Sequence, residues 1–199
     1  MNREQRVRMR VLTTGLVAVA FGLSVGLATG IWGSSQPLVR AAEPSCSPLS
    51  TAFLAGVEVG HQVGQRAPDF ALPDFSGVPV SLSSFRGCPV VVDFWASWCK
   101  PCQVSVPQLE ALRQKHHASG LKVVAVSLDY RREDAARFLD AHAIRGFVNL
   151  WAPFTEGRAV ARQYGVESIP RTIFLDRNGI IRFIGHPESL TDAILAPWL

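Results

Sequence analysis

Two cysteines separated by two residues stand where a strongly apolar run meets an amphipathic segment. Residues 89–95, PVVVDFW, are mostly β-branched and aromatic, which is typical of a strand buried on both faces. Residues 103–116 have the length and the apolar spacing of a helix. The sequence therefore predicts that Cys99 and Cys102 lie where a central strand leads directly into a helix.

This position would activate Cys99 as a nucleophile. The first N–H groups of a helix have no partner within it and form the positive end of the macrodipole, so both stabilise a thiolate. Cys102 lies one turn further on, where it can close a disulfide and release a mixed-disulfide partner. Pro101 suits the first helical turn, and Lys100 adds a positive charge beside the thiolate. We expect Trp98, Lys100 and Pro101 to border the surface that meets a substrate.

A C-x-x-C pair has other uses, such as half of a zinc site or a structural disulfide. A zinc site needs two further ligands, and no Cys/His pair elsewhere in the sequence has suitable spacing. Attachment of a c-type haem would need His after the second cysteine, where this chain has Gln103. The strand-to-helix context favours redox chemistry, and the zinc and structural-disulfide interpretations stay as minor alternatives.

The residues around the pair resemble the active-site signature of the thioredoxin superfamily. The match runs through residues 91–102, VVDFWASWCKPC, and Pro107 corresponds to the helix-kinking proline of that family. The patterns APDF at 67–70 and LSSFRG at 82–87 resemble the N-terminal extension of TlpA/ResA-like and peroxiredoxin-like proteins. The resemblance, which points to the membrane-anchored TlpA/ResA-like branch, extends from about Val63 to the C-terminus.

The resemblance implies a thioredoxin-like α/β fold with a mixed central sheet, an N-terminal hairpin extension and a central insertion. Pro170 stands 68 positions after Cys102 (170 − 102), more than a minimal thioredoxin needs, which matches the inserted strand-and-helix unit of this branch. Two short strands around a Ser76-Gly77 turn are expected before the central strand. Further strands are expected at 121–128, 147–150, 172–176 and 180–185, and helices at 131–142, 156–164 and 188–198.

Pro170 is, by resemblance, the cis-proline that faces the cysteine pair in this family. It would remove an N–H group near the thiolate, while the preceding residue, Ile169, would offer its backbone to an extended substrate. The family usually has Thr after this proline, whereas this chain has Arg171. The departure leaves the local contacts and the partner preference open, but not the fold.

Asp93 lies in the middle of the predicted central strand, six residues before Cys99. A charge there is costly to bury, so one interpretation is a partly exposed strand carboxylate. The other is a buried carboxyl group with a raised pKa that takes the proton from Cys102 as Cys102 attacks the mixed disulfide. Thioredoxin has its buried Asp at the matching position, and this resemblance favours the second interpretation.

Two cysteines remain outside the C-x-x-C pair. Cys88 begins the central strand, and about seven strand residues, or roughly 20–25 Å, separate it from Cys99, so it is a poor resolving partner. Cys88 can be a small buried hydrophobic residue. It can also form a disulfide with Cys46 that ties the preceding linker to the domain. Both interpretations stay open.

The N-terminal third has the organisation of an exported, anchored protein. Residues 1–10 hold four Arg and one Glu, and residues 11–32 hold no charge at all. As a helix, such a 22-residue segment would be about 33 Å long, enough for a hydrocarbon core of roughly 30 Å. The positive-inside rule predicts a cytoplasmic segment 1–10, a single transmembrane anchor 11–32, a linker 33–62 and an extracytoplasmic thioredoxin-like domain 63–199. A cleaved signal peptide is the alternative, and it also exports the domain.

The chain is therefore predicted to be a membrane-anchored, periplasmic thiol-disulfide oxidoreductase whose cofactor is its own Cys99–Cys102 disulfide, with no metal. The resemblance implies reduction of exported proteins such as apocytochrome c, with a membrane electron-donor protein as the second partner. Outside residues 1–10 the net charge is about +1, which gives no footprint for nucleic acid. A thiol peroxidase, which needs Thr or Ser where Ala96 stands, and a metal-binding chaperone are the alternatives.

Overall fold

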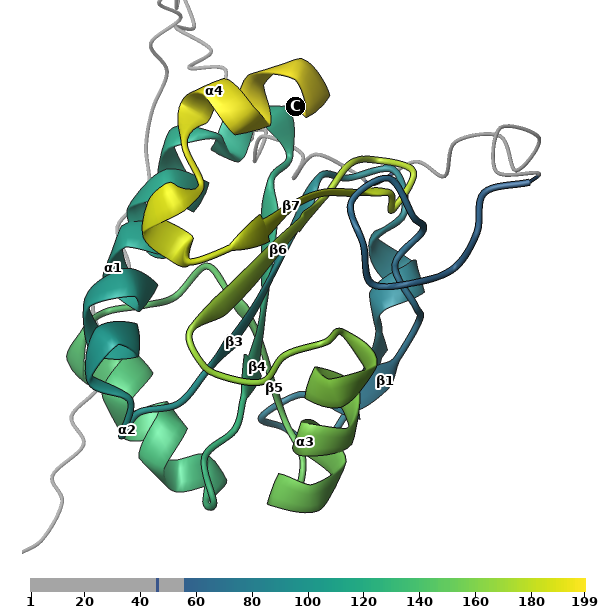
Figure 1. Ribbon diagram of the computed structural model, residues 1–199. Helices are drawn as coiled ribbons and strands as arrows, with labels where there is room; N and C mark the ends of the chain where they lie inside the picture. Colours follow the sequence, from purple (N-terminus) through teal and green to yellow (C-terminus); the bar gives the residue numbers. More distant parts are fainter. Residues whose placement is uncertain (1–45, 47–55) are drawn as a thin grey trace, which may run out of the picture. The chain divides into compact units, whose positions relative to one another are not determined.

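The structure, a computed structural model, describes Cys46 and residues 56–199 of the chain (Figure 1). The predicted cytoplasmic segment 1–10, the predicted anchor 11–32 and most of the predicted linker 33–62 lie outside these residues. Within the described part of the chain, no helix has the length and apolar character needed to cross a bilayer.

A five-stranded mixed sheet in the order β5-β4-β3-β6-β7 forms the centre of the domain. Its middle strand β3 pairs in parallel with β4 and antiparallel with β6. All six residues of β3 are buried, as its β-branched sequence predicts. The strands are β3 (Val90–Trp95), β4 (Lys122–Ser127), β5 (Val148–Trp151), β6 (Arg171–Leu175) and β7 (Ile181–Gly185).

Helices cover both faces of this sheet (Figure 1). Side chains alternate along a strand, so β3 contributes Val91 and Trp95 to one buried cluster and Val92 and Phe94 to the other. The first cluster includes residues of α1, α2 and α4, and the second includes residues of α3. The helices are α1 (Lys100–Lys115), α2 (Arg132–Ala141), α3 (Phe154–Gln163) and α4 (Asp192–Leu195). The expected thioredoxin-like α/β fold is confirmed.

A short hairpin precedes the central strand, as expected. It consists of β1 (Ala71–Pro73) and β2 (Pro79–Ser81), followed by a 3-10 turn at Leu82–Phe85. Its turn is held by Asp74, whose Oδ1 accepts from the Ser76 and Val78 N–H groups, and by Gly77 at a φ of 91°. The hairpin buries Leu72 in the same cluster as α3, so it extends the cover on that face of the sheet.

α2 and β5 form the strand-and-helix unit between β4 and α3. β5 pairs in parallel with β4 and lies at the edge of the sheet. An isolated bridge between Asp74 and Leu150 joins the hairpin to this edge strand. The insertion therefore widens the sheet by one strand and places α2 beside α1 on the same face (Figure 1).

The expectation of one closing helix over 188–198 is wrong. The segment has a 3-10 turn at Pro187–Ser189, the short helix α4, and a second 3-10 turn at Ala196–Trp198. Thr191 has extended backbone angles (φ −93°, ψ 164°), which end the first turn and start a new one. The break lets both Leu190 and Leu195 reach the core beside α1, because one continuous helix would not point both side chains inward.

The structure joins Cys46 and Cys88 by a disulfide, with a Cα–Cα distance of 4.8 Å. Cys88 is buried at the residue before Pro89, just ahead of β3, so the bridge lies at the opposite end of that strand from Cys99. Its sequence separation of 42 residues makes it a long-range covalent link within the fold.

Opening this bridge by Cys46→Ala should lower the free energy of unfolding of the oxidised protein. Closing a loop of this length removes unfolded-state entropy equivalent to about 4 kcal/mol at most, so we expect a loss of roughly 2–4 kcal/mol in denaturant unfolding. Ser45→Ala, one residue away, is the matched control and should leave stability near the wild-type value. Recovery of Cys46 and Cys88 as free thiols in non-reducing peptide mapping would contradict the bridge.

Candidate active site

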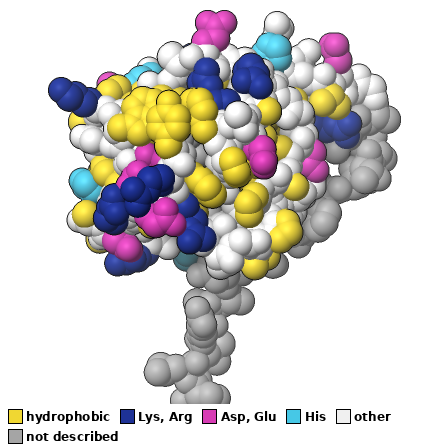
Figure 2. All heavy atoms as spheres, turned by 90° about the horizontal axis from the view of Figure 1, so that it is seen from below, with side chains coloured by type: hydrophobic (Ala, Val, Ile, Leu, Met, Phe, Trp, Pro, Cys, Tyr) yellow, Lys and Arg dark blue, Asp and Glu magenta, His cyan; other side chains and the backbone are white. Residues whose placement is uncertain are grey.

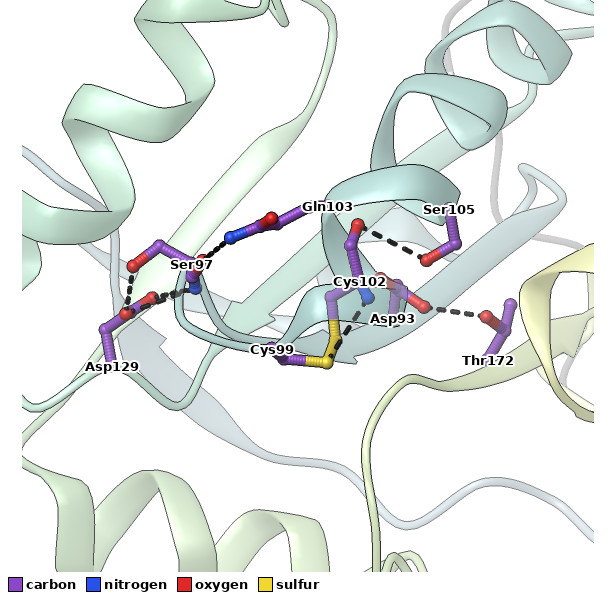
Figure 3. The surroundings of a disulfide bond; sticks show 8 residues. All are labelled: Asp93, Ser97, Cys99, Cys102, Gln103, Ser105, Asp129 and Thr172. Atoms are coloured by element: carbon purple, nitrogen blue, oxygen red, sulfur yellow. Dashed lines mark hydrogen bonds between the residues drawn. A yellow bond between two sulfur atoms is a disulfide. The ribbon is translucent and has the colours of Figure 1, made fainter.

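Cys99 is the N-cap residue of α1, and its sulfur accepts a hydrogen bond from the backbone N–H of Cys102 at 3.2 Å (Figure 3). Its backbone is extended (φ −81°, ψ 106°), and Pro101 follows in the first turn. The hydrogen-bond donor is one of the N–H groups that a helix leaves without an internal acceptor. The sulfur therefore occupies the place at which the helix best stabilises negative charge.

Cys99 and Cys102 are joined in a disulfide of 2.05 Å, and their surroundings differ. Cys102 is completely buried, whereas Cys99 keeps 6% of its surface exposed. Trp98 is 54% exposed, and Lys100 is also exposed. A partner can therefore reach Cys99 past Trp98 and Lys100, while Cys102 is shielded beneath it.

The Ile169–Pro170 peptide bond is cis, as the resemblance implies. Arg171 pairs with Phe94 in the antiparallel ladder between β6 and β3, so Pro170 lies at the same end of the sheet as the cysteine loop. Ile169 is half-buried and packs against both hydrophobic clusters. The structure thus brings the three predicted substrate-facing segments, at Trp98, at Lys100-Pro101 and at Ile169-Pro170, to one edge.

Arg171, the departure from the family pattern, belongs to the other face of the sheet. Directly paired strand residues place their side chains on the same face, and the partner of Arg171 is Phe94, which packs in the cluster beside α3. The next residue, Thr172, pairs with Asp93 on the face of the sheet that α1 covers. The side chain of Arg171 therefore does not lie on the face of β6 that is turned toward α1 and the cysteine pair.

Asp93 is fully buried in the centre of the sheet, so the interpretation as a partly exposed carboxylate is wrong. It points to the same face as Val91 and Trp95, which share a buried cluster with Cys102. Burial raises the pKa of Asp93 to about 7, against the effect of a hydrogen bond from Thr172. The Thr172 hydroxyl donates to Oδ1 at 2.7 Å, whereas Oδ2 has no partner among the described residues (Figure 3).

A second buried carboxylate, Asp129, holds the loop before Cys99 and was not predicted. It accepts hydrogen bonds from both the backbone N–H and the hydroxyl of Ser97, the latter at 2.6 Å (Figure 3). The Ser127 hydroxyl also donates to it, at 2.9 Å. Gln103 of α1 donates to the Ser97 carbonyl at 2.7 Å. Asp129 directly follows the buried strand region 121–128, and parallel strands end at one edge, so this position was a usable signal.

An aromatic cleft of about 310 Å³ adjoins the cysteine loop. The rings of Tyr130 and Phe154 stack with centroids 4.6 Å apart, and Tyr130 is 68% exposed. Figure 2 views the molecule from the side at the bottom of Figure 1, and hydrophobic side chains gather there. The apolar lining is Trp98, Leu128, Tyr130, Phe154 and Ile169, and the polar lining includes Arg158 and Glu167.

Among Cys46 and residues 56–199 there is no group of three or more His, Cys, Asp or Glu side chains that could hold a metal. The structure places the Cys99–Cys102 disulfide and the buried carboxyl group of Asp93 at this site. A redox-active cysteine pair at a helix N-terminus, beside a cis-proline in a thioredoxin-like fold, defines the class of thiol-disulfide oxidoreductases.

Comparison with known proteins agrees with that class. Residues 63–184 match the model of the AhpC/TSA family, and the chain belongs to this family as a TlpA/ResA-like member of the thioredoxin superfamily. The thioredoxin-like protein YneN of Bacillus subtilis is 38% identical over 137 residues, which cover 67% of this chain and 76% of YneN.

Two further relatives carry the same class of activity in their names. The thiol-disulfide oxidoreductase ResA of Geobacillus thermodenitrificans is 32% identical over 61% of this chain and 68% of its own length. A solved structure from Chlorobium tepidum, described as a thiol:disulfide interchange protein DsbE, is 39% identical. It superimposes with a TM-score of 0.62 over 69% of this chain and 99% of its own. The chain is therefore an enzyme of the thiol-disulfide oxidoreductase class.

The buried Asp93 should make the oxidised protein less stable as the pH rises. Its pKa is 3.8 in a free side chain and about 7 in the fold, so the folded state keeps a proton that the unfolded state has lost between these values. At about 1.36 kcal/mol per pH unit, the loss approaches 4 kcal/mol and is complete above about pH 7. Because Asn does not titrate, Asp93→Asn should become more stable than the wild type above that pH.

Denaturant unfolding of both proteins at about pH 5 and about pH 8 measures the effect. The difference in the free energy of unfolding between wild type and Asp93→Asn cancels every other titrating group and should change by roughly 3 kcal/mol between the two conditions. Parallel pH profiles for the two proteins would show that Asp93 does not titrate in this range.

Proposed function

We propose that this enzyme is anchored in the cytoplasmic membrane and reduces disulfides of exported proteins, including apocytochrome c. The observation that carries the proposal is the Cys99–Cys102 pair at the start of α1, in which Cys99 keeps 6% of its surface exposed and Cys102 is completely buried. Membership of the TlpA/ResA-like branch supports the direction of the reaction, because the resemblance to that branch implies a reductant. No metal or soluble cofactor takes part in the proposed reaction.

The reaction begins with the reduced pair. The Cys99 thiolate attacks one sulfur of the substrate disulfide, forms a mixed disulfide and releases the other substrate sulfur as a thiolate, which takes a proton from water. Cys102 then loses its proton to Asp93 and attacks the Cys99 sulfur, which releases the second substrate thiolate. The enzyme gives up two electrons and ends with the Cys99–Cys102 disulfide that the structure contains.

Asp93 has the properties that this second step needs. Its carboxyl group lies on the same face of the sheet as Cys102, in the same buried layer, and has a pKa near 7. A base with a pKa near the working pH combines a useful ionised fraction with enough affinity for a proton. The raised pKa therefore brings the proton affinity of Asp93 closer to that of a thiolate, so the transfer from Cys102 costs less free energy than it would with an ordinary carboxylate and needs no exposure of the site to water.

An extended polypeptide suits the surface around Cys99. Ile169 precedes the cis-proline outside β6, where its backbone can pair with a substrate segment. The cleft lined by Trp98, Tyr130 and Phe154 lies next to this backbone and can take an apolar side chain that neighbours the substrate cysteine.

The N-terminal sequence supports the proposed anchor and location. Residues 11–32 carry no charge, and the four Arg before them favour a cytoplasmic N-terminus. The proposal therefore includes a single-pass anchor, an extracytoplasmic catalytic domain and a membrane electron-donor protein that reduces the Cys99–Cys102 disulfide after each turnover.

Activity of the cysteine variants tests the reaction. The reduced protein should reduce insulin and an oxidised apocytochrome c, and Cys99→Ser should abolish both activities because no nucleophile remains. Cys102→Ser should still attack but accumulate a mixed disulfide that non-reducing gels detect. Peroxide consumption that depends on Cys99 would favour a thiol peroxidase, and tight metal binding by the reduced pair without reductase activity would favour a chaperone.

Fractionation of cells tests the location. The full chain should stay in the membrane pellet after an alkaline wash and keep the mass of its N-terminal segment. The double variant Leu16→Arg/Val19→Arg places two charges in the apolar run at a cost of several kcal/mol, so it should not stay in the membrane pellet. A soluble wild-type protein shortened at its N-terminus would show that the segment is a cleaved signal peptide instead.

A further inference from the structure

We propose that Thr172 is a positioning residue for the resolving step: its hydroxyl holds one oxygen of Asp93 and leaves the other as the oxygen that takes the proton of Cys102. This inference rests on the proposed role of Asp93 and adds a residue of β6 to it. It starts from the asymmetry of the carboxyl group, in which Oδ1 accepts from Thr172 at 2.7 Å and Oδ2 has no partner within the described chain.

The register of the sheet accounts for this contact. Asp93 pairs with Ala125 of β4 on one side and with Thr172 of β6 on the other, so these two side chains are its neighbours across the strands. Ala125 has no polar atom in its side chain. Thr172 is completely buried and supplies the hydrogen bond (Figure 3).

No charged side chain of the described elements takes this place. Asp93 has Ala125 of β4 and Thr172 of β6 as its neighbours across the strands, and Cys102 of α1 lies in the buried cluster on the same face of the sheet. Charged residues of the surrounding elements lie elsewhere. Arg171 is on the other face of the sheet, where its strand partner is Phe94, and Lys100 is exposed. The others form ion pairs with one another: Glu110 with Arg113, Lys115 and His116 with Asp192, Arg182 with Asp176, Arg137 with Asp134, and Arg145 with Asp140. Burial raises the pKa of Asp93, and the hydrogen bond from the Thr172 hydroxyl opposes that shift.

The contact has two consequences for proton transfer. A hydroxyl that donates to one oxygen fixes the rotation of the carboxyl group, so the second oxygen keeps one direction within the buried layer that holds Cys102. The same bond favours the ionised form, because a donor stabilises a carboxylate more than a neutral acid. Without it Asp93 would hold a proton at neutral pH and could not accept another.

Thr172→Val removes the hydroxyl while it keeps the branched shape and the strand preference of the residue. The resolving rate decreases at low pH as Asp93 becomes protonated. The loss of one hydrogen bond to a charged group should raise the pH of this decrease by about one to two units. Resolution at neutral pH should then be about tenfold slower or more, and should recover as the pH is raised. Thr172→Ser, which retains the donor, should restore a profile close to that of the wild type.

The two phases of the reaction of the full-length reduced protein with Ellman's reagent measure this directly. Attack by Cys99 releases the first thionitrobenzoate, and resolution by Cys102 releases the second. Thr172→Val should leave the first phase unchanged and slow only the second. Thr172→Ala serves as the second hydroxyl-free variant if the Val protein does not fold, and circular dichroism checks each fold.

Asp93→Asn separates the two proposals. If it resolves at the wild-type rate with the wild-type pH profile, the role of Asp93 as proton acceptor is wrong and that of Thr172 is wrong with it. Suppose instead that Asp93→Asn resolves slowly and its rate no longer decreases at low pH, while Thr172→Val keeps the pH dependence of the wild type. In that case only the Thr172 proposal is overturned. An Asp93→Asn/Thr172→Val protein that resolves no more slowly than Asp93→Asn alone supports the action of Thr172 through Asp93.

Discussion

The hydrogen bond from the Cys102 N–H to the Cys99 sulfur defines this enzyme more than any other contact, because it marks where α1 begins. A helix that started one turn earlier would satisfy that N–H with a carbonyl and would turn the sulfur away from the positive end of the dipole. The extended backbone of Cys99 and the proline after Lys100 keep the start of the helix at this residue. Covalent reach between the sulfurs and stabilisation of the thiolate both follow from this single boundary.

The sheet order turns this boundary into a site. β3 and β4 are parallel and β6 is antiparallel to them, so the ends of β3 and β4 and the start of β6 share one edge. Asp129, which follows β4 and holds Ser97, and the cis-proline Pro170, which precedes β6, both lie at that edge. Cys88 lies at the opposite end of β3, where its bridge to Cys46 stays apart from the redox pair. The fold thus keeps two disulfides with separate roles at the two ends of one strand.

Local sequence patterns were sufficient to predict most of the helices and strands and the position of the cysteine pair. They were insufficient where contacts between residues far apart in the chain determine the local structure. The buried strand β3, the helix after Cys99 and the hairpin around Gly77 follow from periodicity and turn residues. The broken C-terminal segment does not, because Thr191 ends a turn so that Leu190 and Leu195 can both be buried against α1. The role of Asp129 was missed as well, since its partner Ser97 is 32 residues away in the chain.

The sequence by itself determined the chemistry: two thiols at helical spacing after a buried strand, one carboxyl group in that strand, and an uncharged segment at the N-terminus. These are local facts, because the spacing of residues along one strand or one helix sets the direction of their side chains. Only the tertiary structure decided that Asp93 is fully buried, that Thr172 bonds one of its oxygens and that Arg171 points to the other face. Those outcomes depend on the pairing register between β3 and β6, which brings together residues 79 positions apart, and no local pattern specifies it.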